Sequence, residues 1–316
     1  MAEPIRKLIL GTRGSALAMW QARHVQTLLE RTLSVVVELS IIKTSGDKNT
    51  AQPLSEIGAL AGGKGLFVKE IEEALLERRV DLAVHSSKDL PSSVTEGLVI
   101  AAFLEREDAR DALLVRPGRG TGFAELPRGA KVGTSSLRRA AQICSLRPDL
   151  ETLDLRGNVD TRVRKLGEGQ YDAIVLAHAG LKRMGLAKHV TQLFSVDEML
   201  PAVGQGAIGV EVRAGEALES QIRAALEHAP TRVALDAERG FLAHLGGGCQ
   251  VPVGAHATLR GTEVFLSALI SQVPTAGREP RIVRGRKQGE AVNAAAIGAA
   301  LAAEMLANGG KALLEA

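Results

Sequence analysis

Cys249 is a candidate for covalent chemistry, because it follows three consecutive glycines and lies three residues before a proline. Glycine reaches backbone angles that other residues avoid, and it lets a bulky group approach the main chain closely. A helix is expected from Arg232 to His244, and alternating small apolar residues from Val251 to Ala257 predict a strand that leaves the turn. The thiol is therefore expected on a turn that a large partner can reach. A helix stop with an incidental cysteine fits the same residues.

A second group of reactive residues, Ser86-Ser87-Lys88-Asp89, follows an apolar strand expected at Asp81–His85. Sheets of α/β proteins place their ligands at the carboxyl ends of strands. An extended backbone would turn Lys88 and Asp89 to opposite sides, whereas a turn would present both to a ligand. A solvated surface turn is the alternative.

Three further junctions between a strand and a helix carry hydroxyl or arginine side chains. The first junction carries Thr134, Ser135 and Ser136, followed by Arg138 and Arg139. The second carries Arg156 and Arg162, and the third carries Arg183 after a strand expected at 172–177. Helix N-termini favour anions, and an arginine there opposes the helix dipole unless an anion lies nearby. Three such junctions in one stretch favour a polyanionic ligand over solvated arginines.

The N-terminal part repeats the pattern of strand, turn and helix. A strand is expected at Lys7–Leu10, and Ser15 is a candidate N-cap for a helix that continues towards Leu33. The free backbone N–H groups beside Arg13 suit a carboxylate, although these residues in isolation favour a simple capped helix. Downstream, the glycine-rich segment 58–65 lacks the spacing of a phosphate-binding loop and carries Lys64 either on a lid or on a connector.

Composition excludes several classes of protein. Of the 316 residues, 45% are hydrophobic and 24% charged, which is typical of a soluble globular protein, and no apolar run approaches the ~20 residues that span a bilayer. The first residues contain no signal-peptide core, so a cytoplasmic location is expected. The two cysteines lie far apart and the histidines are scattered, so neither a disulfide nor a metal site is predicted. A net charge of only +3 and 3% aromatic residues argue against nucleic-acid binding.

The order of expected elements predicts an α/β protein with two lobes joined by a double hinge, followed by a smaller α+β domain. The crossings between the lobes are expected near 105–108 and 200–206. The first lobe is assigned to 1–104 and 207–224, the second to 112–200, and the C-terminal domain, which carries Cys249, to 229–316.

Six motifs resemble the porphobilinogen deaminase (hydroxymethylbilane synthase) family, and the resemblance runs in order from Arg13 to the final helix. Five of them are Gly133-Thr134-Ser135-Ser136-Leu137-Arg138-Arg139, Leu155-Arg156-Gly157-Asn158, His85-Ser86-Ser87-Lys88-Asp89-Leu90-Pro91, Pro201-Ala202-Val203-Gly204-Gln205-Gly206 and Gly247-Gly248-Cys249-Gln250-Val251-Pro252. One motif would be moderate support, whereas the ordered set is specific.

The resemblance implies two periplasmic-binding-protein-like lobes, a third domain, and a transferase of tetrapyrrole synthesis that condenses porphobilinogen and releases ammonia. It implies a dipyrromethane cofactor on Cys249, a catalytic Asp89, and a monomer with no nucleic-acid or membrane partner. Positions that line the family's cleft for cofactor and substrate are matched by Arg13, Ser15, Lys88, Ser136, Arg138, Arg139, Arg156, Arg162 and Gln205. Lys64 matches a lysine of a mobile loop, and Arg183 matches a further cleft arginine.

One segment departs from the family, since Ala59-Leu60-Ala61-Gly62 is extra before the Gly-Lys-Gly around Lys64. The rival hypothesis is a non-catalytic, two-lobed binding protein for a small polyanion. It accounts for the arginines and the hinge but gives the cysteine turn no role.

Overall fold

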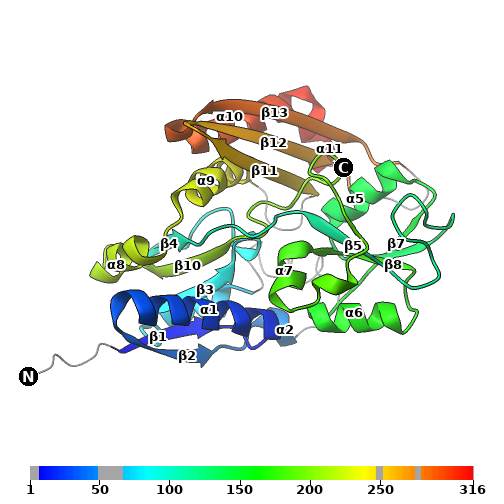
Figure 1. The fold of residues 1–316 in the computed structure, drawn as a ribbon. Helices are drawn as coiled ribbons and strands as arrows, with labels where there is room; N and C mark the ends of the chain where they lie inside the picture. The colour runs from blue at the N-terminus through cyan, green and yellow to red at the C-terminus, as the bar shows by residue number, and fades with distance from the viewer. Residues whose placement is uncertain (1–6, 49–66, 247–251, 275–278, 316) are drawn as a thin grey trace, which may run out of the picture. The chain divides into compact units, whose positions relative to one another are not determined.

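The computed structural model describes residues 7–48, 67–246, 252–274 and 279–315 (Figure 1). The chain forms two compact units, the first from 1–106 and 207–232 and the second from 107–206 and 233–316. The chain passes between the units three times, after residues 106, 206 and 232. The boundaries of a three-domain division stay a prediction.

The first unit contains a mixed sheet in which one antiparallel strand lies among parallel ones. Its order is β2-β1-β3-β10-β4, and β10 runs in the opposite direction to the other four described strands of this sheet. The strands are β1 (Lys7–Thr12), β2 (Val36–Ile41), β3 (Leu82–Ser86), β4 (Leu98–Phe103) and β10 (Ile208–Arg213). Because β10 runs in reverse, its first residue, Ile208, pairs with Ser86 at the carboxyl end of β3.

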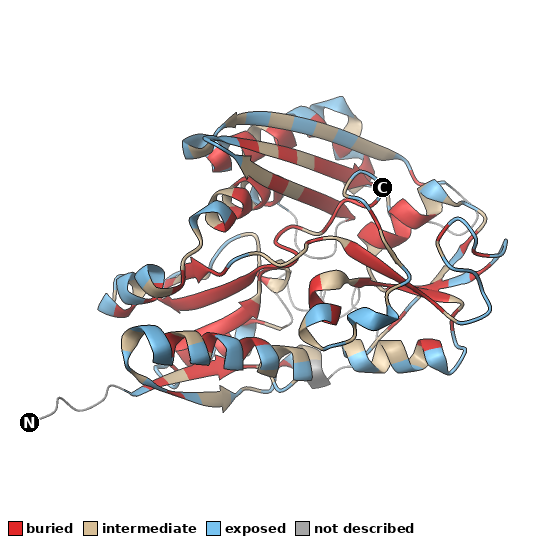
Figure 2. Ribbon diagram, viewed as in Figure 1, coloured by how far each residue is buried: buried red, intermediate tan, exposed pale blue. Residues whose placement is uncertain are grey.

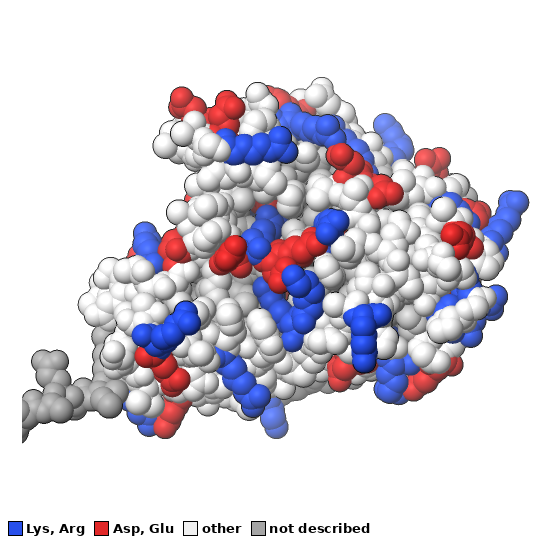
Figure 3. Space-filling model, viewed as in Figure 1, with Lys and Arg blue, Asp and Glu red and all other residues white. Residues whose placement is uncertain are grey.

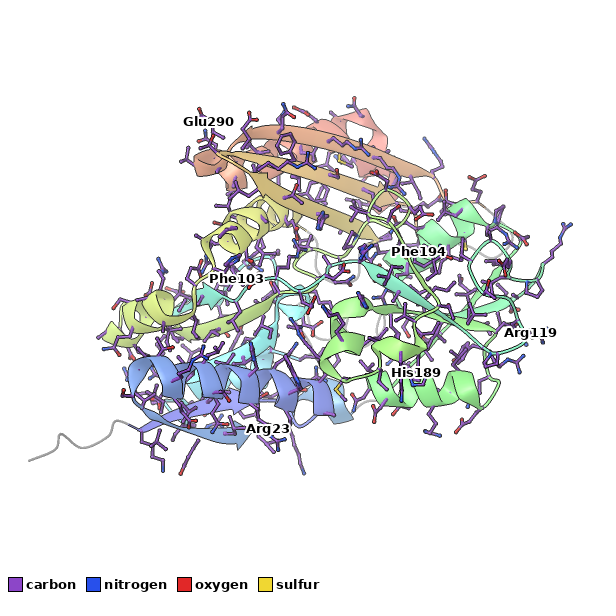
Figure 4. The ribbon with its side chains drawn as sticks, viewed as in Figure 1. Arg23, Phe103, Arg119, His189, Phe194 and Glu290 are labelled. Carbon is purple, nitrogen blue, oxygen red and sulfur yellow. The ribbon has the colours of Figure 1, made fainter. Side chains whose placement is uncertain are left out.

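Helices cover both faces of this sheet. Helices α1 (Ala16–Leu33) and α8 (Ala217–Leu226) pack on one face through a core that includes Val25, Leu29 and Ile222. Helix α4 (Lys69–Leu76) packs on the other face through Ile71 and Leu75. The short elements of this unit are α2 (Ser45–Lys48) and the 3-10 turn η1 (Ser87–Asp89). In Figure 4 the labelled Phe103 marks the end of β4, where the Arg232 guanidinium lies 4.4 Å from its ring centroid.

The amphipathic pattern of residues 67–79 predicts a helix, and the observed helix α4 is shorter. It ends at Leu76, and Arg78 adopts the left-handed conformation with φ +60°. A non-glycine residue in that conformation cannot continue a right-handed helix, so the amphipathic pattern overestimated the helix by about one turn.

The second unit contains a sheet with the same arrangement as the first. Its order is β7-β6-β8-β5-β9, in which β6 is parallel to β7 and β8 while β5 is antiparallel to β8 and β9. The strands are β5 (Asp111–Val115), β6 (Lys131–Gly133), β7 (Glu151–Leu153), β8 (Ala173–Ala177) and β9 (Gln192–Leu193). After β9, the labelled Phe194 in Figure 4 packs edge-on against Phe123, with ring centroids 5.2 Å apart.

Helices follow each of the parallel strands of this sheet. They are α5 (Leu137–Leu146), α6 (Val159–Gly167) and α7 (His178–Arg183), with the 3-10 turn η2 (Ala187–His189) after them. Two sequence expectations are corrected here. The residues at 153–155 predict a strand before Arg156, and the strand lies instead at Glu151–Leu153. The residues around Gly180 predict a helix start, and the helix begins instead at His178, directly after β8.

The C-terminal residues add an antiparallel sheet to the second unit. Strands β11 (Val253–Arg260), β12 (Glu263–Ser271) and β13 (Ile282–Glu290) pair in that order. Buried residues alternate with half-buried ones along the first part of β12, as Figure 2 shows, so one face of the sheet is in the core. Helices α9 (Ala229–His244) and α10 (Ala294–Met305) contribute Phe241, Leu301 and Met305 to that core. The fold class is therefore confirmed: two α/β sheets of matching order and a smaller antiparallel domain.

One helical segment, Ala291–Leu314, is long and apolar enough to cross a membrane by length and composition, with a mean hydropathy of 1.3. It comprises η3 (Ala291–Asn293), α10, the π-helical turn η4 (Leu306–Gly310) and α11 (Lys311–Leu314). Gly309 interrupts it with φ +98°, and Ile297, Leu301 and Leu313 pack in the core with the C-terminal sheet. A helix buried in a protein core can have the same length and apolar composition as a membrane-spanning helix.

Candidate functional site

In the first unit the predicted residues lie at the carboxyl ends of β1 and β3. Arg13 follows β1 directly, and its guanidinium stacks 4.0 Å from the centroid of the Phe67 ring. Ser15 is the N-cap of α1, and its hydroxyl accepts a hydrogen bond from the Ala18 N–H at 3.3 Å. The capped helix is thus confirmed, and the Ser15 hydroxyl oxygen is already used as an acceptor by the helix. Sequence reasoning missed Phe67, for which an aromatic residue beside the glycine-rich segment was the available signal.

Lys88 and Asp89 lie in the 3-10 turn η1, so the backbone leaves the extended conformation immediately after β3. Such a helix has about three residues per turn, which lets both half-buried side chains leave the strand end without one being forced into the sheet. The turn is held on both sides, because the Ser87 N–H donates to the Ala207 carbonyl at 3.0 Å and Leu90 is buried. Within the described part of the chain, the Asp89 carboxylate has no hydrogen-bond or ion-pair partner.

In the second unit the loop after β6 uses its three hydroxyls to build the start of α5. Ser136 is the N-cap, and its oxygen accepts from the Arg139 N–H at 3.4 Å. Thr134 Oγ1 accepts from the Ser136 N–H, while Ser135 Oγ donates to the Leu155 carbonyl at 2.6 Å. Thr134 and Ser136 therefore act as acceptors, and their O–H groups keep a donor that suits a carboxylate.

Arg138 and Arg139 are not solvated, as both are more than nine-tenths buried. They share one carboxylate, that of Asp111, which is fully buried at the start of β5. Arg138 NH1 lies 2.8 Å from Asp111 Oδ2, and Arg139 Nε and NH2 lie 3.0 and 2.8 Å from Asp111 Oδ1. Burial alone would raise the pKa of Asp111, but the charges and hydrogen bonds of the two arginines hold it well below its usual range.

Gln205 completes this cluster from the second crossing. Its Nε2 donates to Asp111 Oδ1 at 2.9 Å and to the Ala109 carbonyl at 2.7 Å. Sequence reasoning placed Gln205 at the site but missed Asp111. The signal was present, because Asp111 is a charged residue directly before the apolar strand Ala112–Val115.

Arg156 and Arg162 lie on either side of the start of α6. Arg156 Nε contacts Asp154 at 3.2 Å, while its NH2 is buried without a hydrogen-bond partner. Arg162 Nε donates to the Gly157 carbonyl at 2.7 Å. Gly157 has φ +112°, a conformation that side chains disfavour, and it brings this carbonyl back towards the helix start.

Arg183 departs from its predicted position at a helix start. It lies at the last residue of α7, where cations are favourable for the helix dipole, and its NH2 donates to the Gly206 carbonyl at 2.6 Å. Burial lowers the pKa of Arg183, and nearby Glu107 opposes that shift. In this structure Arg183 fastens α7 to the second crossing.

Cys249, Lys64 and the extra segment Ala59–Gly62 lie outside the described residues. The two flanks of the cysteine turn are described. Helix α9 ends at His244 before Gly246, and β11 begins at Val253. A Cβ built on Gly254 would lie 2.8 Å from the Pro201 carbonyl oxygen and 3.1 Å from Cδ of Arg138. The strand that leaves the cysteine turn therefore packs directly against the arginine cluster.

Charge and ligand geometry narrow what the site can bind. On the face seen in Figure 3, basic and acidic side chains are intermingled and form no continuous basic surface. No three His, Cys, Asp or Glu side chains among the described residues are arranged to hold a metal ion. The buried arginines, hydroxyl donors and helix starts instead suit a small ligand with several carboxylates.

Fold and site together define an α/β protein with two sheets of matching order, whose strand ends collect cationic side chains. The family model "Porphobilinogen deaminase, dipyromethane cofactor binding domain" matches residues 8–221, and "Porphobilinogen deaminase, C-terminal domain" matches residues 233–307. The chain belongs to the porphobilinogen deaminase family.

Curated relatives extend this finding to nearly the whole chain. The porphobilinogen deaminase of Nitratidesulfovibrio vulgaris (strain Miyazaki F) is 49% identical over 98% of this chain and 96% of its own length. That of Roseiflexus castenholzii is 52% identical over 97% of this chain and 98% of its own length. Among solved structures, a periplasmic substrate-binding protein of an ABC transporter from Coxiella burnetii gives a TM-score of 0.42 at 15% identity, covering 71% of this chain and 93% of its own.

Proposed function

We propose that the protein is a transferase of tetrapyrrole synthesis that condenses porphobilinogen head to tail into linear hydroxymethylbilane and releases ammonia at each addition. Both domain models of the family and the full-length relatives support this activity. We further propose that a dipyrromethane cofactor is joined by a thioether to Cys249, which follows Gly246-Gly247-Gly248.

The side chains of the second unit fit such a group. Arg138 Nε and Arg156 NH2 are buried and have no hydrogen-bond partner among the described residues, which is costly unless a ligand supplies an acceptor. Two arginines face the single carboxylate of Asp111, so the buried cluster keeps one positive charge. A pyrrole pair bearing acetate and propionate groups would satisfy both. When bound, the dipyrromethane supplies the end to which each substrate unit is added.

The residues of this chain would divide the work between binding and charge stabilisation. Arg138, Arg139 and Arg156 hold carboxylates and thereby orient the pyrrole rings. Each addition breaks the carbon–nitrogen bond of the substrate's aminomethyl group and the C–H bond at the free pyrrole carbon of the growing end, and joins the two carbons. The amine leaves as ammonia, the pyrrole C–H proton balances the step, and positive charge develops on the pyrrole in between. The Asp89 carboxylate, fixed by the buried Leu90 and by Ser87, can stabilise that charge without rearranging.

The observation that carries the proposal is the packing of Gly254 against Arg138. Gly254 is five residues after Cys249 in the sequence, and this short separation supports a covalent anchor near the buried, charge-imbalanced arginine pair. A covalent anchor beside a carboxylate-binding cluster suits a cofactor that is both attached and polyanionic. A reversible binder of a small polyanion would need only the arginines.

Intact-mass spectrometry tests this proposal. Wild-type protein from cells that make porphobilinogen is expected to carry the added mass of two linked pyrroles, and Cys249→Ser is expected to lack it. Cys144→Ser is the matched control and should carry the full addition, because Cys144 lies on α5 as a half-buried side chain 4.0 Å from Thr152. A wild-type mass equal to that of the bare chain would refute the covalent cofactor and favour a binding protein.

The cellular location and the oligomeric state of the protein also stay predictions. A cytoplasmic location is tested by cell fractionation, and a monomeric state by light scattering of the eluted protein.

A further inference from the structure

Asp111 is the one carboxylate, among the described residues, that pairs with either Arg138 or Arg139. Its two oxygens receive hydrogen bonds from both guanidinium groups and from the Gln205 amide. It reaches the carboxyl edge of the second sheet only because β5 runs antiparallel, which pairs Asp111 with Ala177 at the end of β8.

The two guanidinium groups also rely on backbone carbonyls for their orientation. Arg138 NH1 donates to the Leu200 carbonyl at 2.6 Å, and Arg139 NH1 donates to the Val175 carbonyl at 3.1 Å. These hydrogen bonds hold one nitrogen of each guanidinium group, but the carbonyl acceptors carry no negative charge. Two buried cations side by side repel each other, and Asp111 is the one negative charge among the described contacts that offsets this repulsion.

We infer that Asp111 is a positioning residue: its buried carboxylate sets Arg138 and Arg139 in the arrangement that receives a carboxylate of the pyrrole ligand. The inference rests on the proposed function, in which these arginines bind the cofactor and substrate. One carboxylate against two guanidinium groups holds the pair and still leaves a positive charge for the ligand. A second internal carboxylate would cancel that charge. If the cluster held no carboxylate, the two guanidinium groups would repel each other and move apart.

The sheet offers a matched control at its opposite edge. Asp172 precedes β8 and pairs with Arg116 and Arg119 at 3.0 and 2.8 Å, so it too is a carboxylate shared by two arginines. It also accepts from the Lys131 N–H at 2.9 Å. Asp172→Asn therefore removes a comparable charge from the same sheet without touching the proposed ligand cluster.

The experiment begins with apo-protein from cells unable to make porphobilinogen, adds porphobilinogen, and follows cofactor attachment by intact mass over time. KM and kcat are then measured per loaded molecule. Asp111→Asn is expected to load several-fold more slowly and to raise KM about 10- to 100-fold, with a smaller change in kcat, as expected for one weakened charge-assisted contact. Asp111→Glu keeps the charge and should be intermediate, whereas Asp172→Asn should load and bind like wild type.

The outcomes separate positioning from simple stability. Wild-type loading and KM in folded Asp111→Asn would overturn the inference, as would equal defects in Asp172→Asn. If Asp111→Asn does not fold, Asp111→Glu decides: a raised KM supports positioning, and a wild-type KM overturns it.

A failure of the proposed function looks different. Wild-type protein that gains no pyrrole mass would remove the function and the inference together. If Arg139→Leu attaches the cofactor normally, the arginine cluster does not bind the ligand. A normal Asp111→Asn, beside a wild type that loads and an Arg139→Leu that does not, refutes the role of Asp111 and leaves the proposed function intact.

Discussion

Asp89 differs from the other predicted side chains of the site, because its carboxylate is not committed to any described partner. Its backbone, by contrast, is fixed by the 3-10 turn, by the Ser87 N–H bond to Ala207 and by the buried Leu90. A carboxylate that is rigidly placed yet unpaired can interact fully with a charge that appears only during the reaction.

Replacing Asp89 should therefore separate charge from shape. Asp89→Asn keeps the shape and loses the charge, and we expect a loss of about 3–4 kcal/mol of transition-state stabilisation, roughly a hundred- to thousandfold in rate. Asp89→Glu keeps the charge with a longer reach and should lie between Asn and the wild type. Single-turnover rates on cofactor-loaded protein measure this order, with the exposed Glu96→Gln of the same unit as the charge control. An Asn variant as fast as the wild type would remove Asp89 from the mechanism.

At the residue scale, the sequence predicted the features that depend on neighbours in the chain. Ser15 and Ser136 cap their helices as expected, because an N-cap contacts a backbone N–H only three residues away. It did not predict the partner of Arg138 and Arg139, because Asp111 lies 27 residues before Arg138 and meets it only through the strand order of the sheet. For the same reason the Arg183 contact with Gly206 was missed.

At the scale of elements, both α/β sheets bring their site residues to the same kind of edge. Parallel strands β1, β3 and β6 end in Arg13, the Ser87–Asp89 turn and the Thr134–Ser136 loop. The reversed strands β10 and β5 begin at those edges, each in the sheet of its own unit. The alternation of strands and helices predicted this edge, whereas the ends of α4 and the start of α7 depended on local backbone angles and strand length.

Replacing Gly254 by alanine tests whether the arrangement of Arg138 and Arg139 depends on the packing of β11. A methyl group there would meet two backbone carbonyl oxygens, at 2.8 Å from Pro201 and 3.1 Å from Leu200, as well as Cδ of Arg138. Backbone atoms cannot move as a flexible side chain does, so Gly254→Ala should cost about 1–3 kcal/mol of stability and slow cofactor attachment. Thermal unfolding and intact mass measure the two effects.

The control for this variant is Gly261→Ala in the turn between β11 and β12. It has open space around its Cβ position but φ +61°, so it should lose stability through backbone strain and keep normal attachment. Normal attachment in Gly254→Ala would mean that β11 does not govern the cluster.

At the scale of the whole molecule, the second unit rests on several aspartates that pair with arginines. Asp108 holds Arg110, Asp111 holds Arg138 and Arg139, and Asp172 holds Arg116 and Arg119. Burial would raise the pKa of each of these carboxyls, but hydrogen bonds and arginine charges outweigh it and lower the pKa in all three. Their stabilising contribution is therefore complete above the ordinary aspartate value of 3.8 and declines as the pH falls below it.

We expect acid to weaken the second unit through these groups. Its free energy of unfolding should change little through them between pH 7 and 5 and fall below about pH 4, by up to about 1.4 kcal/mol per pH unit for each carboxylate that takes up a proton. Asp172→Asn removes one such group, so it should be less stable than the wild type at pH 7 and approach it as the pH falls. Hydrogen exchange of peptides from β6 and β8, measured from pH 7 to pH 3 after correction for intrinsic exchange, reports the local difference, and Glu96→Gln should track the wild type throughout. A gap between Asp172→Asn and the wild type that stays constant down to pH 3 would show that the charge of Asp172 does not stabilise the fold.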